Sequence, residues 1–195
     1  MKTLLFAAAA AACLGAGTIS ADARAADRYV LDMRHSHVQF SVMRFGFNHI
    51  IGQFRGVEAV FNLDEENPEN TTVSAVIEIA SLESSDDERN EILMGEFWFN
   101  EAEYPTMEFH STGVERTGEA TAVLTGDLTL HGQTHPVSLD VVFHKLGTEP
   151  STRGGAAGFT ATGRLNRSQW GMTTAIPVVG DAVDIRIEAL GLLQE

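Results

Sequence analysis

The sequence has a single cysteine, few basic residues and no long hydrophobic run. Cys13 is the one thiol in 195 residues, so these residues cannot form an intramolecular disulfide. No run reaches the roughly 18 to 20 apolar residues that a membrane-spanning helix needs. Lys and Arg number 13 against 27 Asp and Glu, which gives a formal net charge of −14. An acidic body repels phosphate groups, which argues against nucleic acid as a partner and against electrostatic docking on anionic lipid.

The remaining composition is that of an ordinary globular protein. Hydrophobic residues make up 44% and charged residues 21% of the chain, which excludes the disordered and fibrous classes. At about 150 residues per domain, this length predicts one domain with an appendage.

The appendage is residues 1–25, which have the layout of a secretory signal peptide. Lys2 precedes an apolar stretch that ends near Leu14, and the small-x-small triplet Ala23-Arg24-Ala25 predicts cleavage after Ala25. Ala21-Asp22-Ala23 is a competing cleavage site. The sequence therefore predicts an exported, periplasmic protein whose domain spans residues 26–195. In the alternative interpretation Cys13 is the acylated first residue of a lipoprotein, although Ala10 stands where that signal usually has leucine.

From Tyr29 onward the dominant pattern is an alternation of apolar and polar residues with period two. This pattern is typical of strands with one face in a core and one in water. The apolar members of the rows are Val38, Phe40 and Val42; Val57, Ala59, Phe61 and Leu63; Val73, Ala75, Ile77 and Ile79; Met107 and Phe109; Ala122, Leu124, Gly126, Leu128 and Leu130; Val137, Leu139, Val141 and Phe143; Phe159, Ala161, Gly163 and Leu165; and Val183, Ile185 and Ile187. They predict about eight strands.

The short, turn-rich connections between the rows favour antiparallel neighbours. Eight strands with one apolar face each must close into a barrel or fold into a sandwich, and we favour closure because it removes the sheet edges. Ser85 to Glu88 form a capping box, with Ser85 as N-cap, which predicts one short helix near residues 86–94. The predicted fold class is thus all-β, an eight-stranded antiparallel barrel with one helix. Small residues on the inward faces leave room for a ligand unless larger neighbours fill it.

Several segments resemble the YceI-like family in sequence and in order. They are His35 to Val42 with Gly46 and Gly52-Gln53-Phe54; Arg89 to Phe97 leading into Tyr104 to Phe109; Gly126 to Val137; and Arg167 with Gly171, followed by Gly180 to Val183. The resemblance covers nearly the whole chain after residue 25.

The resemblance implies a lipocalin-like barrel in the bacterial periplasm that binds polyisoprenoid or isoprenoid-quinone-type lipids and is not an enzyme. It implies no cofactor apart from the bound lipid, and its partners would be the lipid, a membrane donor or acceptor protein and a second copy in a homodimer. The sequence departs from the family pattern at Arg44, Asn90, Glu91 and Met94, positions where a ligand head group would be met.

The candidate ligand-binding residues come from the apolar rows near the first hairpin and the helix. Hairpin and helix together are expected to form a mouth, and the two arginines are candidates for an oxygen-rich head group because a guanidinium offers several donors. Core packing of the aromatic residues and surface ion pairs of the arginines are the alternatives. The set is Phe40, Val42, Arg44, Phe45, Phe54, Phe61, Ile77, Ile79, Arg89, Phe97, Trp98, Met107, Phe109 and Leu128.

Two functions of other classes remain open at this point. A small-substrate hydrolase or isomerase would use His35, His37 or Arg89 and needs a pocket with convergent polar groups. A ligand-free, stress-related interaction module needs a filled barrel without a cavity. His35 and His37 lie two apart, so on a strand they would share a face, but no third metal ligand is identified and no metal site is predicted.

Overall fold

The computed structural model describes residues 26–194 and contains, within them, eleven strands and one α-helix. Every strand pairing is antiparallel, as the short connections predict. The elements are β1 (Asp27–Leu31), β2 (His37–Arg44), β3 (Asn48–Phe54), β4 (Val57–Leu63), η1 (Pro68–Asn70), β5 (Thr72–Glu78), η2 (Ile79–Ser81), β6 (Leu82–Glu83), α1 (Asp87–Met94), β7 (Thr106–Arg116), β8 (Thr121–Leu130), β9 (Gln133–Thr148), β10 (Gly155–Asn166), η3 (Arg167–Trp170) and β11 (Val179–Leu193).

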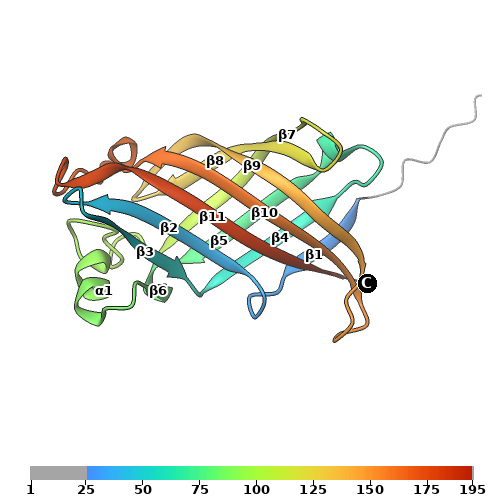
Figure 1. Cartoon of the computed structure of the whole chain (residues 1–195), viewed down its shortest axis with the longest axis horizontal. Helices are drawn as coiled ribbons and strands as arrows, with labels where there is room; N and C mark the ends of the chain where they lie inside the picture. Colours follow the sequence, from blue (N-terminus) through green and yellow to red (C-terminus); the bar gives the residue numbers. More distant parts are fainter. Residues whose placement is uncertain (1–25, 195) are drawn as a thin grey trace, which may run out of the picture.

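Eight of these strands form a closed ring, which confirms the predicted barrel (Figure 1). The order around the ring is β1-β4-β5-β7-β8-β9-β10-β11, and pairing of β1 with β11 closes it. The closing seam is short, with Tyr29, Val30 and Leu31 opposite Leu193, Leu192 and Gly191. At Gly191 a Cβ atom would lie 2.9 Å from the Phe61 ring, so glycine allows the close approach at the seam.

Strands β2, β3 and β6 form an arm that branches from the ring at β11. The first part of β11 pairs with β2, and its last residues pair with β1 along the same edge. The chain between β1 and β2 bridges the gap, because Asp32 N donates to Leu190 O (2.8 Å) and Leu190 N donates to Ser36 Oγ (3.0 Å). One edge of β11 is therefore covered almost continuously by the segment that runs from β1 into β2.

The two ends of the barrel carry different elements (Figure 1). We call the end with α1, the β2–β3 turn and the β10–β11 connection the helix end. The opposite end, with the β4–β5 and β7–β8 connections, is the rim end. Among the residues described, no helix is long and apolar enough to span a membrane.

The strand assignment from the sequence needs two corrections. The row Val38 to Val42 belongs to β2, which lies in the arm, and β1 takes the eighth place in the ring. The row that starts at Val73 ends before Ile79, because Ile79 begins the 3-10 helix η2 and is buried outside the strand. Strands β1, β3 and β6 are additional to the predicted rows.

The predicted helix is present, but its N-cap is one residue later than the capping box places it. Asp86 adopts extended backbone angles and its Oδ1 accepts from Arg89 N (2.9 Å), which makes it the N-cap. Ser85 instead has a positive φ of 62°. The Asn90 side chain accepts from Ser84 N and Ser84 Oγ, so the first turn of α1 is tied to the residue that follows β6.

Asp32 fixes the connection between β1 and β2 electrostatically. His35 Nδ1 donates to Asp32 Oδ2 (2.8 Å), and Arg34 donates to the carboxylate through Nε and its backbone N–H. These bonds lower the pKa of Asp32 from 3.8 to about 2, and the bond from His35 has the largest effect. The ionised carboxylate therefore stabilises the folded state above its unfolded-state pKa, and this contribution is lost as the pH falls toward 2.

We expect Asp32→Asn to lower the free energy of unfolding by about 1–2 kcal/mol near neutral pH. The difference from wild type should shrink below about pH 4, where the wild-type carboxylate begins to lose its advantage. Urea unfolding followed by circular dichroism over a pH series measures both quantities. A difference that stays constant down to the acid limit would contradict this assignment.

Candidate functional site: an apolar cavity through the barrel

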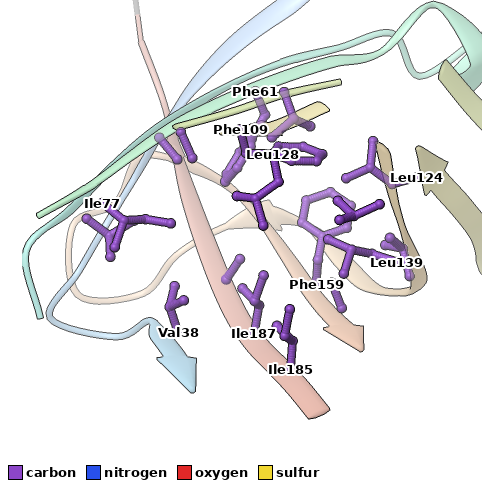
Figure 2. A pocket seen from close by; sticks show the side chains of 18 of the residues that line it. Val38, Phe61, Ile77, Phe109, Leu124, Leu128, Leu139, Phe159, Ile185 and Ile187 are labelled. Carbon is purple, nitrogen blue, oxygen red and sulfur yellow. The ribbon is translucent and has the colours of Figure 1, made fainter. Parts of the chain in front are cut away.

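The interior of the barrel holds a cavity of about 600 Å³. All eight ring strands contribute to its wall, together with β2 and β3 of the arm. Figure 2 shows apolar side chains pointing into it from several strands, namely Val38, Phe61, Ile77, Phe109, Leu124, Leu128, Leu139, Phe159, Ile185 and Ile187. This volume is typical of small-molecule pockets, which span about 300–1,000 Å³. A barrel filled by its own side chains, as the ligand-free module requires, is therefore not what this chain forms.

Alanines and glycines on the inward faces of the strands differ in how much space they leave in the cavity. Ala59 and Ala75 are cross-strand partners on β4 and β5, and both line the cavity. The glycines behave differently, because neighbouring side chains fill the space beside them. A Cβ atom on Gly126 would lie 2.3 Å from the Phe109 ring, and one on Gly163 would lie 2.6 Å from Leu139.

Aromatic rings gather in two places along the cavity wall. Phe40, Phe54 and Phe99 pack together with ring centroids 5.6 to 6.3 Å apart. Phe159 contacts Phe61 and Phe143 at 6.2 and 5.5 Å. Such pairs add packing energy beyond the area they bury, so these ring contacts stabilise the cavity wall.

At the helix end the cavity reaches a buried arginine that the site prediction did not include. The Arg167 side chain is directed by four hydrogen bonds to backbone carbonyls, of Met172 (2.5 Å), Thr174 (2.8 Å), Val179 (3.0 Å) and Gly180 (2.9 Å). Its guanidinium carbon lies 5.1 Å from the centre of the Trp98 ring. Burial lowers the pKa of Arg167.

These four bonds show that Arg167 organises the β10–β11 connection. Both Arg167 and Trp98 line the cavity, so the same residue joins a loop to the cavity wall. In the sequence, Arg167 stood out only because it matches the family pattern together with Gly171. That match did not indicate what the Arg167 side chain does.

Polar and charged lining residues are concentrated at the rim end. Glu65, Arg116, Glu119 and Thr121 are exposed and belong to the cavity wall, which places an opening between the β4–β5 and β7–β8 connections. This opening lies at the end opposite the hairpin and the helix, where the sequence predicts the mouth. Arg116 donates to the carbonyls of Gly118 and Glu119 and thereby fixes its own turn.

Asp64 is a further rim residue, and its carboxylate holds the β4–β5 connection. It accepts from Asn67 N (2.8 Å), Asn70 Nδ2 (3.2 Å) and Glu66 N (3.1 Å), and these bonds lower its pKa. The rim therefore combines an ordered, charged border with the dry interior beneath it.

Most of the candidate ligand-binding residues line this cavity. They are Phe40, Val42, Phe54, Phe61, Ile77, Trp98, Met107, Phe109 and Leu128.

The remaining candidates lie off the cavity wall. Ile79 is buried in the core. Phe45 and Phe97 are exposed, and the Arg44 guanidinium lies 4.2 Å from the Phe45 ring centre. Arg89 donates to Ser84 O and to Asp86 Oδ2 at the start of α1, so its donors serve the helix terminus.

The histidines do not form the shared face that their spacing suggested. His35 lies in the connection before β2 and bonds to Asp32, whereas His37 is exposed at the first position of β2. Figure 1 shows α1, which carries Arg89, apart from this connection. Within residues 26–194 no three His, Cys, Asp or Glu side chains come together as a metal-binding group.

Comparison with known proteins agrees with this architecture. A sequence profile of the YceI-like domain matches residues 29–190. A UPF0312 protein of Pseudomonas savastanoi pv. phaseolicola is 36% identical over 165 residues, which cover 84% of this chain and 85% of that protein. A UPF0312 protein of Ectopseudomonas mendocina is 33% identical over 187 residues, covering 95% and 97% of the two chains.

Solved structures show the same fold at lower identity. Burkholderia cenocepacia BcnA has a TM-score of 0.71 at 22% identity, over 82% of this chain and 98% of that one. A polyisoprenoid binding domain from Saccharophagus degradans has a TM-score of 0.64 at 13% identity, over 85% and 98%. The profile match over most of the described residues and the relatives above 30% identity establish that this chain belongs to the YceI-like family.

Proposed function

We propose that this protein binds the hydrocarbon chain of a polyisoprenoid or isoprenoid-quinone-type lipid inside the barrel and carries it in the periplasm. The observation that carries the proposal is the cavity of about 600 Å³ with an almost wholly apolar wall. The structural neighbour from Saccharophagus degradans, described as a polyisoprenoid binding domain, supports the same ligand class. The periplasmic location rests on residues 1–25, which lie outside the described part of the chain.

The energetics favour carriage over permanent capture. A polyprenyl chain of about forty carbons, at about 0.8 kcal/mol per buried CH₂, has a gross transfer free energy from water near 30 kcal/mol. This exceeds the ceiling of about 20 kcal/mol for noncovalent affinity, so ordering of the chain must offset part of it. In a cell the lipid comes from a membrane that is as apolar as the cavity, so the net free energy of extraction is far smaller.

The arrangement of polar groups supports a binding protein rather than an enzyme. A catalytic site needs titratable groups that converge on one point within reach of a substrate. Here His35 bonds to Asp32 in the connection between β1 and β2, and Arg89 donates to Ser84 O at the start of α1. The buried Arg167 donates to four carbonyls of its own loop.

Filling the cavity tests the proposal directly. Ala75 faces the cavity beside Ala59, so a phenylalanine ring at position 75 can occupy the recess that the two methyl groups leave. We expect lipid extracted from purified Ala75→Phe and quantified by mass spectrometry to fall at least about tenfold relative to wild type, because each displaced CH₂ loses its burial.

Ala80→Phe is the matched control, because Ala80 is exposed on η2. It should retain the wild-type lipid content. Recovery of no isoprenoid lipid from wild-type protein purified from its native periplasm, or undiminished lipid in a folded Ala75→Phe variant, would overturn the proposal.

A further inference from the structure

The helix end of the barrel carries a group of exposed apolar side chains that the cavity does not use. We call this group the apolar tip. The most exposed member is Phe47, at 88%. The members come from the β2–β3 hairpin and the β10–β11 connection and are Met43, Phe45, Phe47, Ile51, Ile176 and Val178.

The two segments of the apolar tip are joined into one surface. Phe45 N donates to Val178 O (2.6 Å), and Arg44 pairs with Val179. Arg167 holds the second segment from below through the carbonyls of Thr174 and Val179. The apolar tip is therefore a fixed structure rather than two independent loops.

The β2–β3 turn has a backbone conformation that a phenylalanine rarely adopts. Phe45 has a φ of 53°, followed by Gly46 at 71°. Turn positions with positive φ are normally occupied by Gly, Asn or Asp, and a bulky residue there is uncommon. A phenylalanine that is both half exposed and in a disfavoured conformation indicates a function for the exposed ring.

The two segments of the apolar tip contain no acidic residue, whereas α1 at the same end of the barrel carries Asp87, Glu88 and Glu91 and Asp181 follows the second segment directly. The chain contains 27 Asp and Glu, yet residues 43–51 and 172–180 contain none. Arg44 and His49 are the ionisable residues of these two segments. A surface that enters the head-group region of a bilayer must avoid carboxylates, which would be repelled by phosphates and costly to dehydrate, and it tolerates arginine at its border.

We propose that the apolar tip docks on the surface of a lipid bilayer, with Phe47 entering the acyl boundary. The occupant is a membrane rather than a second protein copy, because the tip lies at the projecting end of an elongated barrel (Figure 1). Apolar side chains at one end of a barrel can insert into a deformable interface, whereas a stable protein interface buries a broad complementary surface of about 800 Å² per partner.

The apolar tip is continuous with the helix end of the cavity. Val42 lines the cavity two residues before Arg44, and Val183 opposite it also lines the cavity. Docking thus brings the helix end of the cavity to the membrane, while the opening at the rim end faces away from it. A role for docking in lipid uptake or release rests on the proposed function, but docking itself does not.

Flotation with phosphatidylcholine vesicles tests the docking. We expect wild-type protein to float with the vesicles. Phe47→Asp and Val178→Asp should each lower the ratio of vesicle-bound to free protein about tenfold. Because the protein is acidic, phosphatidylglycerol added to the vesicles should not strengthen binding. Val76→Asp is the matched control, since Val76 is an exposed valine on β5, away from the tip, and it should bind like wild type.

A second measurement places the residue in the bilayer. Tryptophan fluorescence of Phe47→Trp, corrected for the wild-type signal, should shift to shorter wavelength with vesicles and be quenched by brominated acyl chains. Absence of flotation, flotation unchanged by both tip variants, or a tip-dependent dimer in sedimentation without vesicle binding would each overturn the proposal. Bound lipid is quantified in every variant, so retained docking with absent cargo would count against the cavity proposal alone.

Discussion

Replacement of Arg167 by methionine is expected to lower the free energy of unfolding by about 3 kcal/mol or more. The guanidinium donates to the carbonyls of Met172, Thr174, Val179 and Gly180, and no methionine atom can donate to them. Each carbonyl that remains buried without a donor costs about 1–3 kcal/mol. Urea unfolding of the purified variant, monitored by circular dichroism, gives the change in free energy.

Arg164→Met is the matched control for this change. Arg164 lies near the end of β10, three residues before Arg167, and its exposed side chain pairs with Asp184 at 2.5 Å. Exposed ion pairs contribute about 1 kcal/mol or less, so this variant should stay close to wild type. Arg167→Lys keeps the charge but has a single ammonium group for four diverging carbonyls, so it should recover only part of the loss. Equal stabilities of Arg167→Met and Arg164→Met would show that the four bonds contribute little.

Phe40→Asp is expected to reduce the lipid recovered with the purified protein to a background level. Phe40 lines the cavity and packs against Phe54 and Phe99 at 5.7 and 6.3 Å. A carboxylate at this position must either ionise in an apolar space or draw water into it, and both disfavour a bound hydrocarbon chain. Extraction and mass spectrometry against the wild-type protein, purified in parallel, measure the loss.

Ser41→Asp is the control, because residue 41 is adjacent on β2 and its side chain points to the opposite face of the sheet. It introduces the same charge and should leave the lipid content unchanged. Circular dichroism verifies the fold of both variants. If Phe40→Asp does not fold, Phe40→Asn offers a neutral polar group at the same place. A folded variant of either kind with wild-type lipid content would show that Phe40 is not part of the binding surface.

The barrel could be predicted from the sequence because its strands carry a local signal. Val38, Phe40 and Val42 alternate with polar residues, and the structure turns all three toward the cavity. Strand β1 was missed because Tyr29, Val30 and Leu31 form a continuous apolar run without alternation. The closure itself depends on pairing of β1 with β11, a contact between distant segments for which no local pattern exists.

The cavity could be anticipated only in outline. Alternation indicates which residues face inward, but whether a small residue leaves space depends on neighbours on other strands. Gly126 and Gly163 look like openings in the sequence, yet the side chains of Phe109 and Leu139 occupy the space beside them. Arg167 escaped prediction for the same reason, because three of its four acceptors are carbonyls seven to thirteen residues later in the chain.

The short seam between β1 and β11 also determines when this protein can fold. Tyr29 cannot pair with Leu193 until the ribosome has synthesised almost the entire described chain. Until then the ring stays open, and nascent segments with open strand edges aggregate readily. Closure of the ring is therefore a late step in the folding of this chain, and its apolar rows need protection from aggregation until the seam forms.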